Sequence, residues 1–386
     1  MYQYEKTNRI AADLAALTDM KVQLDDRGTM SRRWEGRLRR ELESEAVAAS
    51  TSLEGVPVTA DDVRRILVGD VPSRVTAEDA SLVRGYQGAM SYVLRRADDP
   101  SFVWQSELVR AIQDRVLAGS YAAGAGRFRP GAAYVISRRD GSVIYEPPVA
   151  ETVPGFVDEL MAEVSVDALS AAERAALVHI GIAGVHPFRD GNGRTARVLA
   201  SLAMYRGGFQ RPEFTSLEEW WGEHPADYYE AFSVLGPVWD PTADVTPFVE
   251  QHVSAQLAQV RELDLRLAAE RQLWSALENV ADGLGQPRLT EALYDAFFGR
   301  GVTNRYFRAV ADVTPVTAAS DLARLVTSGM LEVLGRGRST RYAAAPALAR
   351  RVAEEAGLGE GFPGEAPLDQ QRAWIMARLR GRVAQR

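Results

Sequence analysis

The chain has 386 residues, 46% of them apolar and 25% charged, with a formal net charge of −7 at pH 7. This length suffices for two or three domains with apolar cores, and the negative charge argues against a protein that coats nucleic acid throughout. The absence of cysteine excludes disulfides, thiolate zinc sites and cysteine nucleophiles. We expect a cytoplasmic protein without membrane contact, because no signal-peptide pattern is present and no apolar run approaches the roughly 20 residues of a span.

Apolar residues three and four positions apart predict helices through most of the N-terminal part. The predicted helices are Ala11–Leu24, Ser31–Ala49, Asp79–Arg96, Ser106–Leu117 and Val153–Val164. In the second helix an apolar stripe at spacings of four consists of Trp34, Leu38, Leu42 and Ala46. One segment differs: in GAAYVISRRDGSVIYEPPV, two short β-branched runs flank Asp140-Gly141, which predicts a β-hairpin over Ala133–Tyr145.

The helical pattern resumes after the hairpin and is interrupted once. The later helices are predicted at Ala171–Val185, Arg194–Tyr205, Pro225–Val234 and Pro247–Val280, and the segment ADGLGQPR, Ala281–Arg288, resembles a linker. Three short helical patterns follow, at Leu289–Phe298, Asn304–Ala311 and Thr317–Ser328. Two short apolar runs around a Gly/Arg turn then complete the outline of a winged helix-turn-helix. A Gly/Pro-rich spacer from Gly357 leads to a last helix with Trp374, Ile375 and Leu379.

The winged-helix segment is locally basic, with seven arginines and three acidic residues over Gly299–Tyr342. Three of the arginines lie in the predicted wing, where they suit phosphates: Arg336, Arg338 and Arg341. The helix that would enter a DNA groove, however, offers only Ser320 and Arg324 for reading bases. DNA binding and a role in protein contact or dimerisation both stay open, and so does the oligomeric state.

The interruption between helices is the stretch HPFRDGNGRTAR, His186–Arg197. Gly191 and Gly193 permit a backbone turn whose N–H groups form an anion-binding concavity. At the start of a helix, the free amides and the helix dipole strengthen that preference. Arg194 and Arg197 are neighbours on one helix face and suit a chain of phosphates.

The other residues of the stretch supply the remaining parts of a nucleotidyl transfer. Asp190 is an oxygen ligand of the kind that Mg²⁺ prefers, and His186 can accept a proton from a hydroxyl near neutral pH. Phe188 is predicted to anchor the loop in the core. Each residue alone also has an ordinary structural explanation, such as a turn, a helix end or a surface ion pair. It is their combination in twelve residues that indicates a functional site.

The stretch resembles the signature of Fic-domain proteins, HxFx[DE]GNGRxxR, at every defined position. The resemblance implies a mainly α fold, a Fic-type helical bundle with a β-hairpin flap, and transfer of AMP from ATP to a target hydroxyl. It assigns the base to His186, Mg²⁺ to Asp190, and the phosphates to Gly191, Asn192, Gly193 and Arg194, with the γ-phosphate on Arg197. The family's Doc branch has a lysine in this anion-binding turn and transfers phosphate, so Gly193 favours AMP transfer.

By the same resemblance, the flap pairs with an extended segment of the target protein through Tyr134, Val135 and Ile136. The target would offer a Ser, Thr or Tyr hydroxyl. The sequence does not fix the donor nucleotide; Tyr228 and Tyr229 are candidates near the base pocket, although both are also explained as core aromatics. The fold is expected to end in a winged helix-turn-helix domain, as in many such proteins.

A second stretch, Ser50–Gly55, reads STSLEG and resembles the inhibitory motif [ST]xxxE[GN] of Fic proteins. Glu54 is expected at the C-terminus of a helix, where the dipole repels a carboxylate, so a compensating partner is needed. The simplest explanation is solvent or a nearby arginine. The resemblance implies instead that Glu54 reaches Arg197 and takes the place of the γ-phosphate, while Ser50 pins the helix to the core.

These observations predict four regions and three candidate functions. The regions are 1–100 with an inhibitory helix at about 31–55, the Fic core at 101–280, a winged-helix domain at 281–350 and a helical tail at 351–386. The leading function is an autoinhibited protein adenylyltransferase. The alternatives are a phosphodiesterase that removes AMP with the same residues, and a DNA-binding regulator that uses the pocket as a nucleotide sensor.

Overall fold

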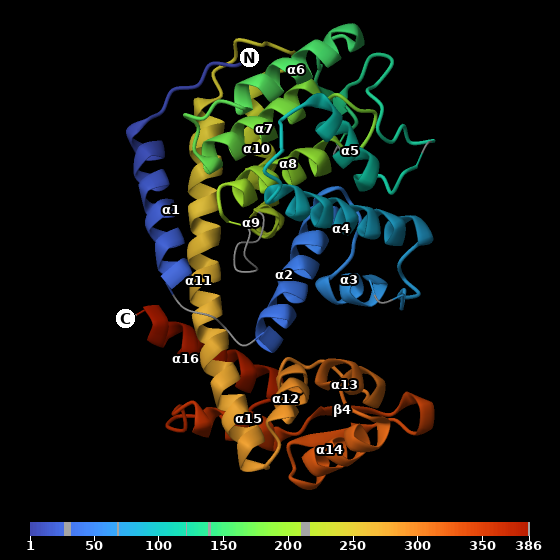
Figure 1. The fold of residues 1–386 in the computed structure, drawn as a ribbon, viewed down its shortest axis with the longest axis vertical. Coiled ribbons are helices and arrows are strands. Elements are labelled where there is room, and N and C mark those ends of the chain that lie inside the picture. The colour runs from blue at the N-terminus through green and yellow to red at the C-terminus, as the bar shows by residue number, and fades with distance from the viewer. Residues whose placement is uncertain (27–31, 68, 121, 138–139, 210–216, 385–386) are drawn as a thin grey trace. The chain divides into compact units, whose positions relative to one another are not determined.

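The computed structural model describes residues 1–26, 32–67, 69–120, 122–137, 140–209 and 217–384, and the side chains of 25, 26, 32–40, 338 and 384 lie outside the description. The protein is mainly α-helical (Figure 1). It forms two compact units, Met1–Leu263 and Asp264–Arg386, with the division inside one long helix, α11 (Thr246–Gly283). Among the described residues, no helix is both long and apolar enough to cross a bilayer.

Two helices, α7 (Ala171–Val185) and α8 (Asn192–Arg206), lie side by side at the centre of the first unit (Figure 1). A capping box between Ser170 and Glu173 fixes the start of α7. Nearly every side chain of α7 is buried, as expected for a helix that is apolar on all sides. Around this pair pack α4 (Ala77–Ala97), α5 (Ser106–Val116) and α6 (Val153–Val164).

The N-terminal helices border this bundle. Within the first unit, α1 (Asn8–Asp26) runs beside α11 (Figure 1), and Ser254 donates a hydrogen bond of 2.5 Å to Asp13. Helix α2 (Arg32–Leu53) is followed by the short α3 (Ala60–Leu67). Of the predicted stripe on α2, Leu42 and Ala46 are buried; the side chains of Trp34 and Leu38 lie outside the described part.

The predicted hairpin is confirmed, but its strands are short. Strand β1 (Val135–Ile136) pairs antiparallel with β2 (Val143–Tyr145), so that Val135 lies opposite Tyr145 and Ile136 opposite Val143. At the turn, Asp140 Oδ1 accepts hydrogen bonds from the backbone N–H and the hydroxyl of Ser142, a local bond typical of Asx turns.

Three helices were not predicted: α3, α9 (Glu218–Glu223) and α15 (Pro346–Glu355). Each has at most 10 residues, so periodicity alone is weak evidence for such a helix, although α13 with 8 residues was predicted. Other short elements that complete the first unit are α10 (Pro225–Ala231) and the 3-10 helices η1 (Ala150–Thr152) and η2 (Phe232–Leu235).

The second unit has the predicted order of three helices and a hairpin. Its elements are η3 (Pro287–Leu289), α12 (Thr290–Phe297), α13 (Asn304–Ala311), α14 (Pro315–Thr327), β3 (Leu331–Leu334), η4 (Gly337–Ser339), β4 (Arg341–Ala344), α15 and α16 (Leu368–Ala384). Strands β3 and β4 are antiparallel, and Val302 forms a bridge to Tyr342. Phe307, Leu322 and Leu325 are fully buried between these helices.

Candidate functional site

The predicted motif connects the end of α7 to the start of α8. His186 caps α7 with a left-handed backbone (φ 48°) and donates its N–H to Ile182. Gly191 precedes α8 with φ 83°, a conformation that glycine adopts without strain. Between them, Phe188 is fully buried.

Asn192 holds this loop closed with both ends of its side-chain amide. Its Oδ1 accepts from the N–H of Phe188 and its Nδ2 donates to the Phe188 carbonyl, each at 2.9 Å. The amide was expected to contribute to a phosphate site. In this structure the side chain is bonded to the backbone of Phe188 in the loop between α7 and α8.

The His186 imidazole is neutral at physiological pH. Burial lowers its pKa to about 4, because a charged ring is poorly solvated there. Its Nδ1 lies 3.3 Å from the carbonyl oxygen of Ala183. A carbonyl can only accept a hydrogen bond, so this contact favours the tautomer with the proton on Nδ1. Nε2 then carries a lone pair that can take up a proton.

Asp190 and Arg194 form an ion pair beside the glycine turn. Asp190 Oδ1 accepts from the Gly191 N–H at 2.6 Å and from Arg194 Nη2 at 3.0 Å. The Asp190 side chain is 56% exposed, whereas that of Arg194 is 4% exposed. The Nε and Nη1 atoms of Arg194 are buried without a hydrogen-bond partner among the described residues. Such unsatisfied donors favour an anion at this position.

A metal site made by protein side chains alone is absent from the described part of the chain, where no three His, Asp or Glu residues gather suitably. Mg²⁺ does not require one, since it typically takes one or two carboxylates and fills its shell with water and phosphate. Asp190 fits this pattern, because it is exposed and both hydrogen bonds of its carboxylate use Oδ1.

Arg197 is fully enclosed, and helix α2 surrounds most of its guanidinium. Nε donates to Ser50 Oγ at 2.8 Å, and Nη2 donates to the Ser50 carbonyl at 3.0 Å and to Glu54 Oε1 at 2.8 Å. Nη1 donates to the Tyr228 hydroxyl at 2.8 Å. The structure therefore brings the second predicted motif, Ser50 and Glu54, onto the last arginine of the first.

The Glu54 carboxylate also lies against the start of α8. A Cβ atom placed on Gly193 would come within 2.5 Å of Glu54 Oε1, so only glycine permits this approach. Glu54 follows the C-terminus of α2, where a carboxylate is unfavourable, and it is compensated by Arg197 and by the N-terminus of α8. Its side chain is 26% exposed.

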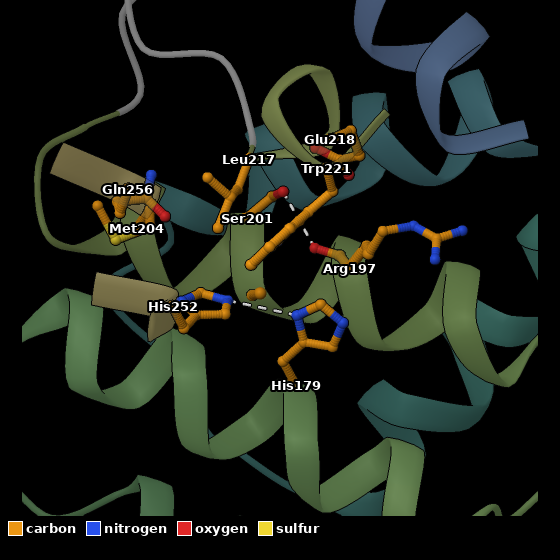
Figure 2. Close-up of a pocket in the computed structure, with 10 residues that line it drawn as sticks. His179, Arg197, Ser201, Met204, Leu217, Glu218, Trp221, His252 and Gln256 are labelled. Carbon is orange, nitrogen blue, oxygen red and sulfur yellow. Dashed lines mark hydrogen bonds between the residues drawn. The ribbon is translucent and has the colours of Figure 1, made fainter. Parts of the chain in front are cut away.

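A buried polar chain continues behind Arg197. The Tyr228 hydroxyl, whose pKa burial raises to about 12, lies 3.3 Å from His179 Nε2, and His179 Nδ1 lies 3.3 Å from His252 Nε2. Figure 2 shows the two histidines together at a small cavity, with the Arg197 guanidinium pointing away from them. Burial lowers the pKa of His252 to about 3 and also lowers that of His179.

Glu218 lines the same cavity (Figure 2) and accepts a hydrogen bond from Tyr86. Burial raises the pKa of Glu218 to about 7. Sequence reasoning missed His179, His252, Glu218 and Tyr86. A polar residue inside an apolar helix, such as His179 in AALVHIGIAGV, was the available signal, but the partner positions are set by the fold.

Some of the candidate residues line a cleft of about 760 Å³, a size typical of small-molecule sites. Asp190, Arg194 and Arg197 are not part of its walls. Its walls include Glu54, His186, Gly193, Tyr228 and Tyr229, together with Val135 and Ile136 from the hairpin. The third predicted hairpin residue, Tyr134, is 52% exposed and is not part of these walls. The Tyr229 hydroxyl donates to the carbonyl of Leu53, the last residue of α2, at 2.6 Å.

The chain is similar in sequence to a known family and to several curated proteins. Residues 104–204 match the Fic/DOC family profile. The chain is 38% identical over 135 residues to protein adenylyltransferase fic-1 of Caenorhabditis elegans and 28% identical over 240 residues to protein adenylyltransferase Fic of Nematostella vectensis. The matches cover 35% and 59% of this chain but only 24% and 52% of those relatives. The chain thus spans about a quarter to a half of their length.

Solved structures resemble the fold. A Fic family protein from Desulfovibrio desulfuricans G20 superposes with a TM-score of 0.58 at 20% identity, covering 89% of this chain and 98% of that one. At this identity the likeness concerns the fold alone. Fic-1 from C. elegans superposes with a TM-score of 0.53 at 25% identity, covering 66% of this chain and 72% of that one.

Proposed function

Since this chain contains a Fic domain, we propose that it is an autoinhibited protein adenylyltransferase, which transfers AMP from ATP to a hydroxyl side chain of a target protein and of itself. The relatives named protein adenylyltransferase support this activity. The cleft supports it too, because a neutral histidine, an exposed carboxylate and a phosphate-binding turn lie on one loop.

The observation that carries the proposal is the position of the Glu54 carboxylate. It pairs with Arg197 at 2.8 Å and lies against Gly193 at the N-terminus of α8, where free amides and the helix dipole favour an anion. A nucleotide phosphate needs the same arginine and the same amides. We infer that Glu54 takes the place of the γ-phosphate, so that ATP binds out of line for attack until Glu54 moves away.

The proposed reaction joins the target hydroxyl oxygen to the α-phosphorus of ATP and breaks the bond from that phosphorus to the oxygen leading to the β-phosphorus. Pyrophosphate leaves, and the hydroxyl proton passes to Nε2 of His186. The ring can accept it because it is neutral and Nε2 carries a lone pair, although the pKa of about 4 makes the free ring a weak base. The negative charge of bound phosphates raises that pKa and so makes the neutral ring a stronger base.

The phosphates are expected to engage the buried Nε and Nη1 atoms of Arg194 and the backbone N–H of Gly193, while the N–H of Gly191 is available only when it leaves Asp190. Mg²⁺ would be held by Asp190 and would neutralise phosphate charge when bound. Residues at the hairpin edge would hold an extended target segment by strand addition. Ile136, Val143 and Ile144 are exposed there, which supports a docking role.

The experiment that tests this proposal is transfer of label from α-labelled ATP with Mg²⁺ to the protein itself. Glu54→Gly should label strongly, wild type weakly, and Glu54→Gly combined with His186→Ala not at all. Label from γ-labelled ATP should stay absent, because AMP transfer releases the γ-phosphate with pyrophosphate. If folded Glu54→Gly labels no more than wild type, the inhibitory role of Glu54 is wrong.

A second candidate is removal of AMP from a modified protein. One observation favours it: Glu54 and His186 line the same cleft, so the carboxylate could orient a water while the histidine returns a proton to the leaving hydroxyl. Release of AMP from a labelled protein by wild type, lost in Glu54→Gly, would favour this activity.

For the second unit we propose a winged helix-turn-helix that serves as a contact domain. The order α12, α13, α14, β3, β4 and the bridge from Val302 to Tyr342 support this. Arg336 and Arg341 are exposed near the β3–β4 turn, which suits phosphates. Salt-sensitive DNA binding lost in Arg336→Ala/Arg341→Ala would favour a DNA role, and a concentration-dependent dimer would favour a protein contact.

A further inference from the structure

Arg129 makes an unusual set of contacts beside the motif. It is 4% exposed and directs its guanidinium to three backbone carbonyls. Nε donates to His186 at 2.9 Å, Nη1 to Gly131 at 2.8 Å, and Nη2 to Pro148. Its own N–H donates to the Pro187 carbonyl at 2.9 Å.

Two of these carbonyls stand at the two ends of the hairpin. Gly131 precedes β1 and Pro148 follows β2, so one planar group ties both ends of the hairpin together. The third carbonyl belongs to the residue that carries the proposed base. A fork with donors in fixed directions can span these three oxygens, whereas the single ammonium of a lysine cannot.

The same contact stabilises an otherwise costly backbone at His186. A non-glycine residue in the left-handed region (φ 48°) is strained and persists only when its surroundings hold it. The cation of Arg129 lies at the C-terminus of α7, where the helix dipole favours positive charge. Tyr145 adds a second tie, since its hydroxyl donates to the Gly184 carbonyl in the last turn of α7 at 2.7 Å.

We propose that Arg129 is a positioning residue that sets the hairpin at a fixed place relative to the His186 imidazole. This role rests on the proposed AMP transfer, in which the hairpin holds the target segment and His186 takes the proton of the target hydroxyl. Arg129 touches neither the nucleotide nor the hydroxyl. It determines whether the hydroxyl delivered by the hairpin meets Nε2 of the base.

The test is the automodification rate with α-labelled ATP and Mg²⁺ in the full chain carrying Glu54→Gly. Arg129→Lys should lower the rate at saturating ATP at least about tenfold, since small misplacements of reacting groups cost that much or more. The ATP concentration for half-maximal rate should change less than about twofold, because the phosphate-binding groups are untouched.

The matched control is Arg206→Lys. Arg206 also donates to three backbone carbonyls, those of Arg96, Ala97 and Asp99, but at the other end of α8. Its variant should keep the rate within about twofold. A rate in Arg129→Lys equal to that of Arg206→Lys would overturn the proposal, and so would an equal loss of ATP affinity. If Arg129→Lys does not fold, Arg129→Gln replaces it; failure of both to fold would overturn the proposal in favour of a purely structural role.

An independent measurement separates this inference from the proposed function. The chain has four histidines, so a sample with ¹³C at the Cε1 positions gives a simple spectrum, in which the His186 signal is identified with His186→Ala. Arg129→Lys should shift that signal and its titration midpoint while His179 and His252 stay in place. The charged groups that face His186 are Arg129, Glu54 and Asp190, and the last two are unchanged. An unmoved His186 signal would overturn the inference even if no AMP transfer is found.

Discussion

At the scale of residues, the central feature is the Glu54 carboxylate, which lies at the C-terminal end of α2, where the helix dipole disfavours a negative charge. Glu54 follows the last turn of α2, yet it contacts Arg197 and the first turn of α8. The pair is largely buried, with the Arg197 side chain 2% exposed, so loss of the carboxylate leaves a buried charge without its counter-ion. Here Ser50 adds two hydrogen bonds to the same guanidinium, and the lock therefore depends on the whole end of the helix.

Tyr229 is predicted to strengthen this lock from the other side. Its hydroxyl bonds the Leu53 carbonyl, and removal of one such bond costs about 1 kcal/mol. We expect Tyr229→Phe to raise basal automodification about threefold to tenfold, less than Glu54→Gly does. The measurement is label from α-labelled ATP. In the Glu54→Gly background the same substitution should add no further activation; an additional increase there would refute the assignment.

At the scale of elements, the junction of α7 and α8 carries the site. A short loop connects the two helices, and Phe188 in this loop is fully buried. The Asn192 side-chain amide is bonded to both the N–H and the C=O of Phe188. The left-handed cap at His186 and the turn at Gly191 then aim the imidazole and the amides into one cleft. A rigid junction of this kind suits groups that must act together.

Asn192→Ala should weaken this junction. Two buried hydrogen bonds are lost and the N–H and C=O of Phe188 are left without partners, which predicts a loss of about 1–3 kcal/mol in the free energy of unfolding. Urea unfolding measures it. Asn192→Asp keeps the acceptor for the Phe188 N–H but places a second oxygen against the Phe188 carbonyl, so it should lose stability as well. An Ala variant as stable as wild type would contradict the predicted role of the amide.

At the scale of the whole molecule, the first unit encloses several titratable groups that the chain could not place by itself. His179, His186 and His252 have lowered pKa values, to about 4 for His186 and about 3 for His252, because burial disfavours the charged ring. Glu218 has a pKa raised to about 7 for the same physical reason.

These shifts predict how stability depends on pH. A histidine with a pKa lowered below the unfolded value of 6.5 stabilises the fold fully above that value, and the contribution is lost as pH falls toward the folded pKa. Glu218 acts in the opposite sense. Its raised pKa adds stability as pH falls from about 7 toward the pKa that a glutamate has in the unfolded chain. Between about pH 6.5 and 5 the three histidines act against the one glutamate, and the loss of stability that they cause is the larger effect.

We therefore expect the first unit to lose stability on acidification from pH 7 to pH 5. Urea titrations followed by hydrogen exchange in peptides from α7 and α8 would measure this unit separately. Glu218→Gln should make the loss steeper, because the opposing group is removed. Stability that rises on acidification would show that the buried histidines are not neutral in the folded protein.

The sequence by itself determined the helices with long periodic patterns, the hairpin and the residues of the two motifs. These features are local: α6, α7 and α13 have the predicted bounds because apolar spacing and capping residues act within a few positions. The short α3 and α9 were missed, because helices of 6 to 8 residues offer few positions that can show a pattern; α13, equally short, is the exception.

Only the tertiary structure decided what these residues contact. The pairing of Glu54 with Arg197 joins positions 143 residues apart, and the ties from Arg129 to the hairpin ends and from Tyr229 to α2 have no counterpart in local spacing. The hydrogen bonds of the Asn192 side chain to the Phe188 backbone likewise depend on the folded loop. Local sequence fixes periodicity and turns, whereas burial and hydrogen-bond partners depend on which helices pack together, and that is a property of the whole fold.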